Sequence, residues 1–254
     1  PWHIQFSRGA WEANISLTLT LAGIYFFLRA LEKTWFLTLS SLFFSLTLLT
    51  YQGAKLSTLI IILILVVLYW KKVKVWLNSA RPPLAGTFFV GLLISAPIIV
   101  SMFQEKTGRL EVFSVFSYPR KLGDIVEILG EGKEKAGSLS YYLYHSETLN
   151  FTRGLFGRWF NHFSGRFLLF EGDYQNPRHS APNHGMLLIS ELVLLISGFL
   201  ALSRLKNSNK LRNFAILWLV LAPLPAVLSR DQVHAVRALN MVIPLTLVSA
   251  LGLA

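Results

Sequence analysis

Seven apolar blocks divide the chain, and each is close in length to a membrane-spanning helix. They are apolar on all sides, unlike the 3.6-residue stripe of a soluble bundle. A span needs roughly 20 mostly apolar residues, about 17 at least, and flanking Trp, Tyr, Lys and Arg can extend shorter blocks by snorkelling. The blocks are Ile15–Leu28, Trp35–Thr50, Leu56–Trp70, Leu84–Phe103, Met186–Ser203, Phe214–Leu228 and Ala238–Ala254. We expect an all-α polytopic membrane protein with about seven transmembrane helices.

Composition agrees with this class. Hydrophobic residues make up 53% of the chain and charged residues only 15%, whereas soluble domains carry about 25% charged residues. We therefore expect no soluble domain of ordinary size. The chain has no cysteine, which excludes disulfides and thiolate metal sites.

The net charge of +11 is concentrated in three short loops, Arg29–Lys33, Lys71–Arg81 and Arg204–Arg212. These hold ten basic residues against the single acidic Glu32, whereas the long loop Gln104–His184 holds ten basic and nine acidic residues. This is the positive-inside pattern. It predicts a multi-pass membrane protein with the long loop extracytoplasmic. We expect the membrane to be a bacterial plasma membrane. The charge thus indicates topology, and we expect membrane lipids and not nucleic acid as partners.

Alternating spans also place three shorter segments on the outer side: Pro1–Asn14, Tyr51–Lys55 and Ser229–Arg237. We expect one membrane domain in three parts: residues 1–103 with an outer juxtamembrane helix and the first four spans, 104–184 as the extracytoplasmic loop, and 185–254 with the last three spans. Because the chain begins in a loop at a proline and ends inside an apolar run, we expect a fragment truncated at the N-terminus and at the C-terminus.

The long loop contains a phenylalanine stripe. Five phenylalanines follow one another at steps of four and three, which is one face of a helix over Arg153–Phe170; they are Phe156, Phe160, Phe163, Phe167 and Phe170. Three arginines lie off the stripe. The pattern predicts an amphipathic helix in the membrane interface, with its aromatic rings down and its arginines toward phosphates. The alternative is a helix packed on other parts of the loop.

Two carboxylates near spans have open interpretations. Arg8 and Glu12 are four residues apart, so on a helix they share a face. They form either a surface ion pair of an interfacial helix or a polar pair at the outer mouth of a cavity. Glu191 lies one turn into the fifth span and either snorkels outward or serves a function inside the span.

Two outer loops carry the other candidate binding residues. Glu171–Gly185 is rich in Gly, Asn and Pro, which favour an irregular loop, and it concentrates Asp173, Arg178, His179 and His184. With His162, some of these could ligate a metal, but the spacing matches no metal motif. We therefore expect no metal ligands and no cofactor. A bound divalent metal ion stays open as the alternative.

In Ser229–Asn240, a helix would place Arg230, His234 and Arg237 on one face at i, i+4 and i+7. Two guanidinium groups and an imidazole at the outer mouth of a span could bind a phosphate, which arginine holds bidentately. The alternative is anchoring of the loop in the membrane interface.

Familiar catalytic and transport motifs are missing from the sequence. It contains no Walker loop, GxGxxG or HExxH and no GxSxG. An arginine ladder and a selectivity filter are also absent, and no internal repeat of the kind common in transporters is evident. These absences argue against nucleotide-driven enzymes, zinc peptidases, serine hydrolases and channels.

Four segments resemble one family: PWHIQFSRGAWEAN at the start, the Tyr51–Lys55 turn YQGAK, His162–Gly185 and His234–Pro244. Together they are similar to the dolichyl-phosphate-mannose–protein mannosyltransferase-like membrane glycosyltransferases of the GT-C fold. The resemblance touches both ends and the middle of the chain, and the middle segment is the most specific. Gln52 and Lys55 depart from the family, which has His and Arg at these positions.

The resemblance implies protein or glycan glycosylation: inverting transfer of a sugar from a polyprenyl-phosphate donor to a protein, lipid or glycan acceptor on the extracytoplasmic face. A carboxylate would act as general base, and cationic groups would stabilise the leaving phosphate. The family's catalytic aspartate lies in an outer loop that would precede Pro1, so the catalytic residue is unknown here. Glu12 matches the family's second acidic position, and the resemblance implies an accessory role for it. We expect the fragment alone to be inactive.

For this function the substrate-binding residues are expected to be Arg8, Asp173, Arg178, His179, Arg230, His234 and Arg237. Two other functions remain open. A transporter or flippase of a lipid-linked or anionic solute would share the basic outer mouth, and a non-catalytic membrane scaffold subunit would lack an acidic residue in the upstream loop.

Overall fold

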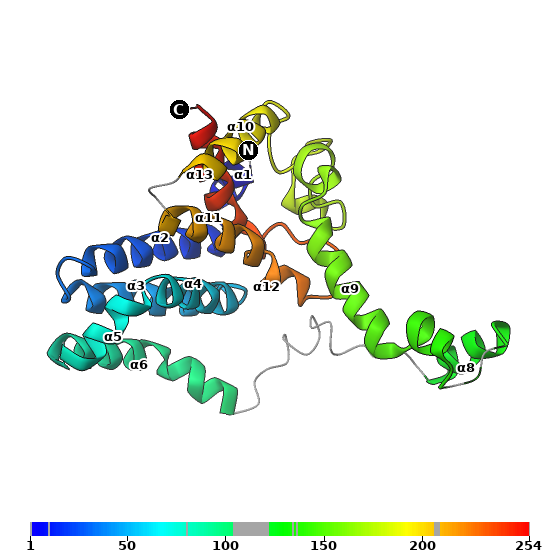
Figure 1. Ribbon diagram of the computed structural model, residues 1–254, viewed down its shortest axis with the longest axis horizontal. Coiled ribbons are helices and arrows are strands. Elements are labelled where there is room, and N and C mark those ends of the chain that lie inside the picture. The colour runs from blue at the N-terminus through cyan, green and yellow to red at the C-terminus, as the bar shows by residue number, and fades with distance from the viewer. Residues whose placement is uncertain are drawn as a thin grey trace.

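The computed structural model describes residues 2–9, 11–79, 81–103, 122–133, 135, 137–205 and 209–253. Within these ranges the chain is helical and has no strand, which confirms the all-α class. The residues 104–121 of the long loop lie outside the described part. Figure 1 labels the main helices, which are α1 Trp2–Arg8, α2 Glu12–Ala30, α3 Phe36–Thr50, α4 Ala54–Leu68, α5 Trp70–Ser79, α6 Arg81–Phe103, α8 Leu122–Glu131, α9 Glu147–Asn161, α10 Glu191–Arg204, α11 Asn209–Leu221, α12 Leu224–Val227 and α13 Val242–Leu253.

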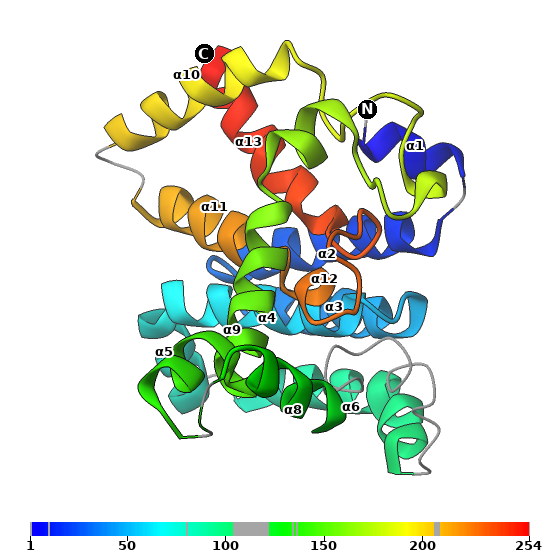
Figure 2. The same ribbon diagram turned by 90° about the vertical axis from the view of Figure 1, so that its right-hand side faces the viewer.

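Stacked helices form the body of the protein. In both views α2, α3 and α6 lie in successive layers, with α4 packed between α3 and α11 (Figures 1 and 2). Its core contains Ile61 and Leu65 of α4 and Trp218 of α11, each at most 1% exposed. The outer surface keeps large apolar side chains, among them Phe88, Phe89, Leu92 and Leu93 of α6, each more than 60% exposed. Such a surface suits lipid better than water.

α10 and α13 cross very closely. A side chain at Gly198 would collide with the backbone of Val248, and one at Gly252 with the carbonyl of Leu194. Small residues at a crossing let two helix backbones approach, which is common where helices pack inside membranes. α10 and α13 therefore form one tightly joined pair.

In the part of the chain that the structure describes, two segments are long and apolar enough to cross a membrane, Glu12–Ala30 and Asn209–Val227. A third candidate is the pair α4 and α5, which is bent by 88°. Three further apolar helices are shorter: Phe36–Thr50, Pro83–Ile98 and Leu239–Leu253. Each of the seven predicted blocks overlaps a helix, but only two or three candidate spans meet the length and composition of a span. The seven-span topology stays a prediction.

The three predicted basic loops meet at one end of the bundle. The ring of Phe27, near the end of α2, lies 5.7 Å from that of Trp76 in α5. Lys210, at the start of α11, has its ammonium 4.6 Å from the ring of Tyr69. In Figure 1 the α2–α3 turn and α5 occupy the left end, and α12 lies toward the right. The side of the membrane on which this end lies stays a prediction.

The phenylalanine stripe does not form one helix. α9 ends at Asn161, and a separate π-helical turn spans Arg166–Phe170. The helix ends because His162 turns its ring back to the Arg158 carbonyl, and the Ser164 hydroxyl accepts the Phe167 N–H. The prediction of a continuous helix over Arg153–Phe170 is therefore wrong.

The division gives the phenylalanines different environments. Phe156 and Phe160 are 61% and 62% exposed, whereas Phe167 is fully buried, 5.5 Å from the ring of Trp2. α9 lies beside the right-hand end of the stacked helices in Figure 1 and runs steeply in front of them in Figure 2. The indole N–H of Trp159 donates to the Val220 carbonyl of α11 at 2.8 Å. An interfacial position for the exposed half stays a prediction.

Arg8 and Glu12 lie on different helices. α1 ends at Arg8 and α2 begins at Glu12. Between them the Trp11 indole folds over Gly9 so closely that no side chain would fit there. The expected shared helix face is therefore wrong. Glu191 has a local role, since its carboxylate accepts the Leu188 N–H at 3.0 Å in the turn just before α10.

Candidate functional site

Asp173 organises a tight turn at the end of the bundle opposite the basic loops. Its Oδ1 accepts the backbone N–H of Asn176 at 3.1 Å and the Asn176 side-chain amide at 3.2 Å. Pro177 then starts a 3₁₀ turn, Pro177–His179, since its fixed φ suits a first helical position. This turn brings His179 back to Asp173, with Nδ1 and Oδ2 3.0 Å apart.

The glycine before Asp173 is required by the turn. Gly172 has φ +68°, and a side chain there would collide with Ser180 and Met186. Only glycine adopts this backbone conformation at little cost. The local sequence Gly-Asp-x-x-Asn-Pro-x-His thus explains how a carboxylate and an imidazole become paired within one loop.

Residues 229–238 form no helix, so the expected helical face of Arg230, His234 and Arg237 is wrong. Side chains of the preceding loop instead accept four successive backbone N–H groups of this segment. Gln175 accepts those of Gln232 and Val233. His162 Nε2 accepts that of His234 at 3.2 Å, and Asp173 Oδ2 that of Ala235 at 2.8 Å.

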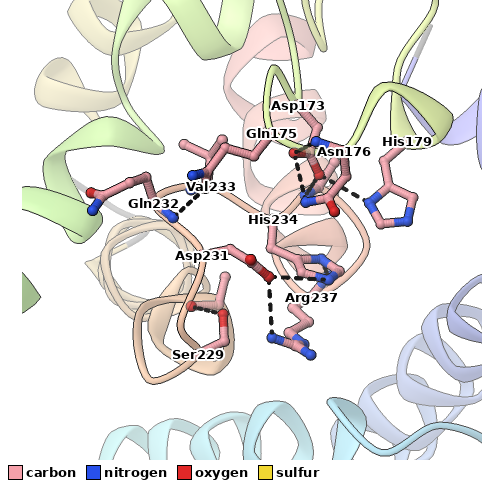
Figure 3. Close-up of polar contacts among 12 residues, drawn as sticks. Asp173, Gln175, Asn176, His179, Ser229, Asp231, Gln232, Val233, His234 and Arg237 are labelled. Carbon is pink, nitrogen blue, oxygen red and sulfur yellow. Dashed lines mark hydrogen bonds and ion pairs between the residues drawn. The ribbon is translucent and has the colours of Figure 1, made fainter. Parts of the chain in front are cut away.

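These contacts follow from burial. Val233 and Ala235 are fully buried, and a buried N–H outside regular secondary structure must find another acceptor. Figure 3 shows Asp173, Gln175 and the 231–237 segment facing one another. Two loops far apart in the sequence therefore form one polar cluster.

The protonation of Asp173 and His162 follows from their partners. Burial alone would raise the pKa of Asp173, but hydrogen bonds from His179, the Ala235 amide and Asn176 together lower it below its ordinary value. Burial lowers the pKa of His162 to about 4. Because its Nε2 accepts a hydrogen bond, Nδ1 of the neutral ring donates to the Arg158 carbonyl at 2.7 Å.

His234 lies between the Asp173–His179 pair and Arg237 (Figure 3). Its ring is 5.0 Å from that of His179, and its Nδ1 accepts the Arg237 N–H at 3.4 Å. Burial, followed by the positive charge of Arg237, lowers the pKa of His234 to about 3. Asp231 pairs with this group: its Oδ2 is 3.7 Å from an Arg237 guanidinium nitrogen and 3.9 Å from His234 Nε2.

A cavity of about 390 Å³ opens beside the cluster and is lined by Gly9, Trp11, Glu12, Ala13 and Tyr51. The Trp11 ring lies 5.1 Å from His179 and so separates the cavity from the cluster. Burial raises the pKa of Tyr51, and Arg237 opposes this through its charge and a hydrogen bond to the Tyr51 side chain. Arg237 therefore joins the cluster to the cavity wall.

Arg8 lines a different cavity, of about 260 Å³, together with Ser180, His184 and residues of α1. The expectation that Arg8 and Glu12 line one cavity is therefore wrong. The break between α1 and α2 is the reason, because it places the two side chains on different helices and in different cavities.

The structure thus brings together four predicted site residues, Asp173, His179, His234 and Arg237, with Glu12 beside them at the cavity. Arg178 and Arg230 are exposed. The sequence did not indicate a site role for four further residues, Trp11, Tyr51, Gln175 and Asp231, and it indicated His162 only as a possible metal ligand. Trp11, Tyr51 and Gln175 carried a signal, since each lies in a segment that resembles the glycosyltransferase family.

The cluster also has the composition of a metal site. Asp173, His179 and His234 are buried, and one ligand atom from each lies within 4.8 Å of the others. Two of the ligands considered from the sequence, His162 and His184, lie outside this group. Both nitrogens of His162 take part in hydrogen bonds within the protein, and His184 points its Nδ1 to the Gly185 carbonyl in the second cavity.

Comparison of the chain with protein-family models, curated proteins and solved structures finds no match.

Proposed function

We propose that this chain forms part of a membrane glycosyltransferase that moves a sugar from a polyprenyl-phosphate donor to an acceptor on the extracytoplasmic face. One observation carries the proposal. Glu12 and Tyr51 line the same cavity, and Arg237 binds Tyr51. A carboxylate and a phenol thus border one space, and a guanidinium contacts the phenol.

The size and position of the cavity suit a sugar phosphate. Its 390 Å³ falls in the range of about 300–1,000 Å³ that small-molecule pockets occupy. It lies next to the first turn of α2, a 19-residue apolar helix near the N-terminus. In a bilayer, a donor could keep its polyprenyl chain beside the spans and place its phosphate at the outer mouth.

The reaction would break the bond between the anomeric carbon and the phosphate oxygen while the acceptor oxygen attacks from the opposite side. The phosphate leaves with the bonding electrons, and Arg237 and the Tyr51 hydroxyl stabilise its charge. A carboxylate base takes the acceptor proton. We assign Glu12 to orientation of the acceptor, and we assign the base to no residue of this chain.

The test uses the complete coding sequence that contains this chain, expressed in membranes and supplied with polyprenyl-phosphate sugars carrying a radioactive label. Arg237→Ala should lower sugar transfer about 10²- to 10³-fold, as for loss of other groups that stabilise a developing anion. Arg204→Ala is the matched control, since this exposed arginine lies at the end of α10. Equal transfer by the two variants at equal expression would remove the assignment.

A further inference from the structure

The Asp173 carboxylate is fully buried, and a buried charge needs a compensating charge as well as hydrogen bonds. Its partners within the described residues are the Ala235 and Asn176 amides and the imidazole of His179. Neither amide carries a charge. Compensation must therefore come from a proton on His179 or from a bound cation.

A second imidazole distinguishes these two cases. His234 is buried beside the Asp173–His179 pair, and its ligand atom lies within 4.8 Å of theirs. A proton shared by Asp173 and His179 needs no third group, and burying another imidazole 5.0 Å away adds nothing to it. A metal ion would use all three donors.

We propose that Asp173, His179 and His234 bind one divalent ion of the zinc class, which fastens residues 171–180 to residues 231–237. One carboxylate and two imidazoles form a donor set that favours zinc over magnesium or calcium. Zinc would take the place of the proton between His179 Nδ1 and Asp173 Oδ2, and that proton would leave to solvent.

The required movement is small. Two ligands of a tetrahedral zinc ion, each about 2.1 Å from the metal, lie about 3.4 Å apart, whereas Nδ1 and Oδ2 are 3.0 Å apart. His234 would move inward by a ring tilt. Three protein ligands leave one position of the ion for water or another oxygen ligand.

Outer contacts that hold metal ligands in place are already present. The Ala235 and Asn176 amides orient the Asp173 carboxylate, and His162 holds the backbone of His234. Such contacts typically fix ligand orientation around a metal. The neighbouring carboxylate of Asp231 faces both Arg237 and Arg158.

The experiment measures zinc in the full-length protein, purified in detergent with a tag that contains no histidine. Elemental analysis should find about one zinc per chain. Asp173→Asn and His234→Gln should each lose it, whereas His184→Gln, in the same loop but outside the cluster, should keep it. Zinc retained by both cluster variants would overturn the proposal.

A second measurement uses the unaltered protein, so it does not depend on the folding of any variant. After chelation, added zinc should raise the thermal unfolding temperature and added magnesium should not. Cobalt should give the visible absorption of a tetrahedral site. If the purified protein holds no zinc and zinc gives no shift, the cluster is a protonated His179–Asp173 ion pair. Neither readout needs a sugar donor, so each stands apart from the proposed activity.

Discussion

The Asp173 carboxylate accepts the backbone N–H of Ala235 at 2.8 Å, across a separation of 62 residues in the chain. This bond joins the turn that carries His179 to the segment that carries His234 and Arg237. The same carboxylate is hydrogen-bonded to the side chains of His179 and Asn176. Asp173 is thus the residue on which both loops of the candidate site depend.

Removal of Asp173 should destabilise the protein strongly. Asp173→Ala leaves the Ala235 and Asn176 amides and the His179 ring without their buried acceptor, a loss worth about 3–5 kcal/mol in comparable networks. Thermal unfolding in detergent measures the effect. Glu171→Ala is the control, because its ion pair with Arg166 is about half exposed and such pairs contribute under about 1 kcal/mol. Similar losses in the two variants would contradict the role given to Asp173.

Acid should weaken the fold through His162. This ring is fully buried with a pKa of about 4, against an ordinary value of 6.5. Because the unfolded chain binds the proton more tightly, the stabilisation is complete above pH 6.5 and is lost as the pH falls through 4. The full effect is on the order of 3 kcal/mol.

Unfolding midpoints in denaturant between pH 7 and pH 4 test this expectation. The wild-type curve should fall more steeply than that of His162→Gln, which has no titrating ring at this position. His184→Gln should follow the wild type, since its ring lies in the second cavity. Parallel curves for wild type and His162→Gln would show that His162 is not held neutral.

Two glycines should respond oppositely to alanine. In an exposed helix, Gly→Ala usually stabilises by about 0.5–1 kcal/mol, and at Gly157 of α9 the space around an added side chain is open. At Gly198 the added methyl collides with the backbone of Val248, so Gly198→Ala should separate α10 from α13. Thermal unfolding of the two variants should shift in opposite directions, and a gain in stability for Gly198→Ala would contradict the close crossing.

The helical class and the helices themselves could be predicted from the apolar blocks, because a long apolar run has few other stable solutions. The breaks between helices were harder to predict from the sequence. The end of α1 depends on the Trp11 ring folding over Gly9, and the end of α9 on the His162 ring turning inward. Both are contacts made by the folded chain, and residue spacing does not encode them.

The candidate site, too, could be predicted from the sequence only in part. Asp173, His179, His234 and Arg237 could be chosen because polar residues gathered in outer loops. Their pairing could not, since it arises from buried amides of residues 232–235 that need acceptors. Spacing suggested a helical face for His234 and Arg237, whereas tertiary contacts hold them in an irregular segment.

The central claim, that the cavity beside Glu12 and Tyr51 receives the sugar-phosphate donor, can be measured directly by protection of a single thiol. The chain contains no cysteine, so Ala13→Cys in this cavity and Ala181→Cys in the second cavity each add one. A polyprenyl-phosphate sugar should slow alkylation at position 13 and leave position 181 unchanged. Alkylation of position 13 at the same rate with saturating donor and without it would contradict the claim.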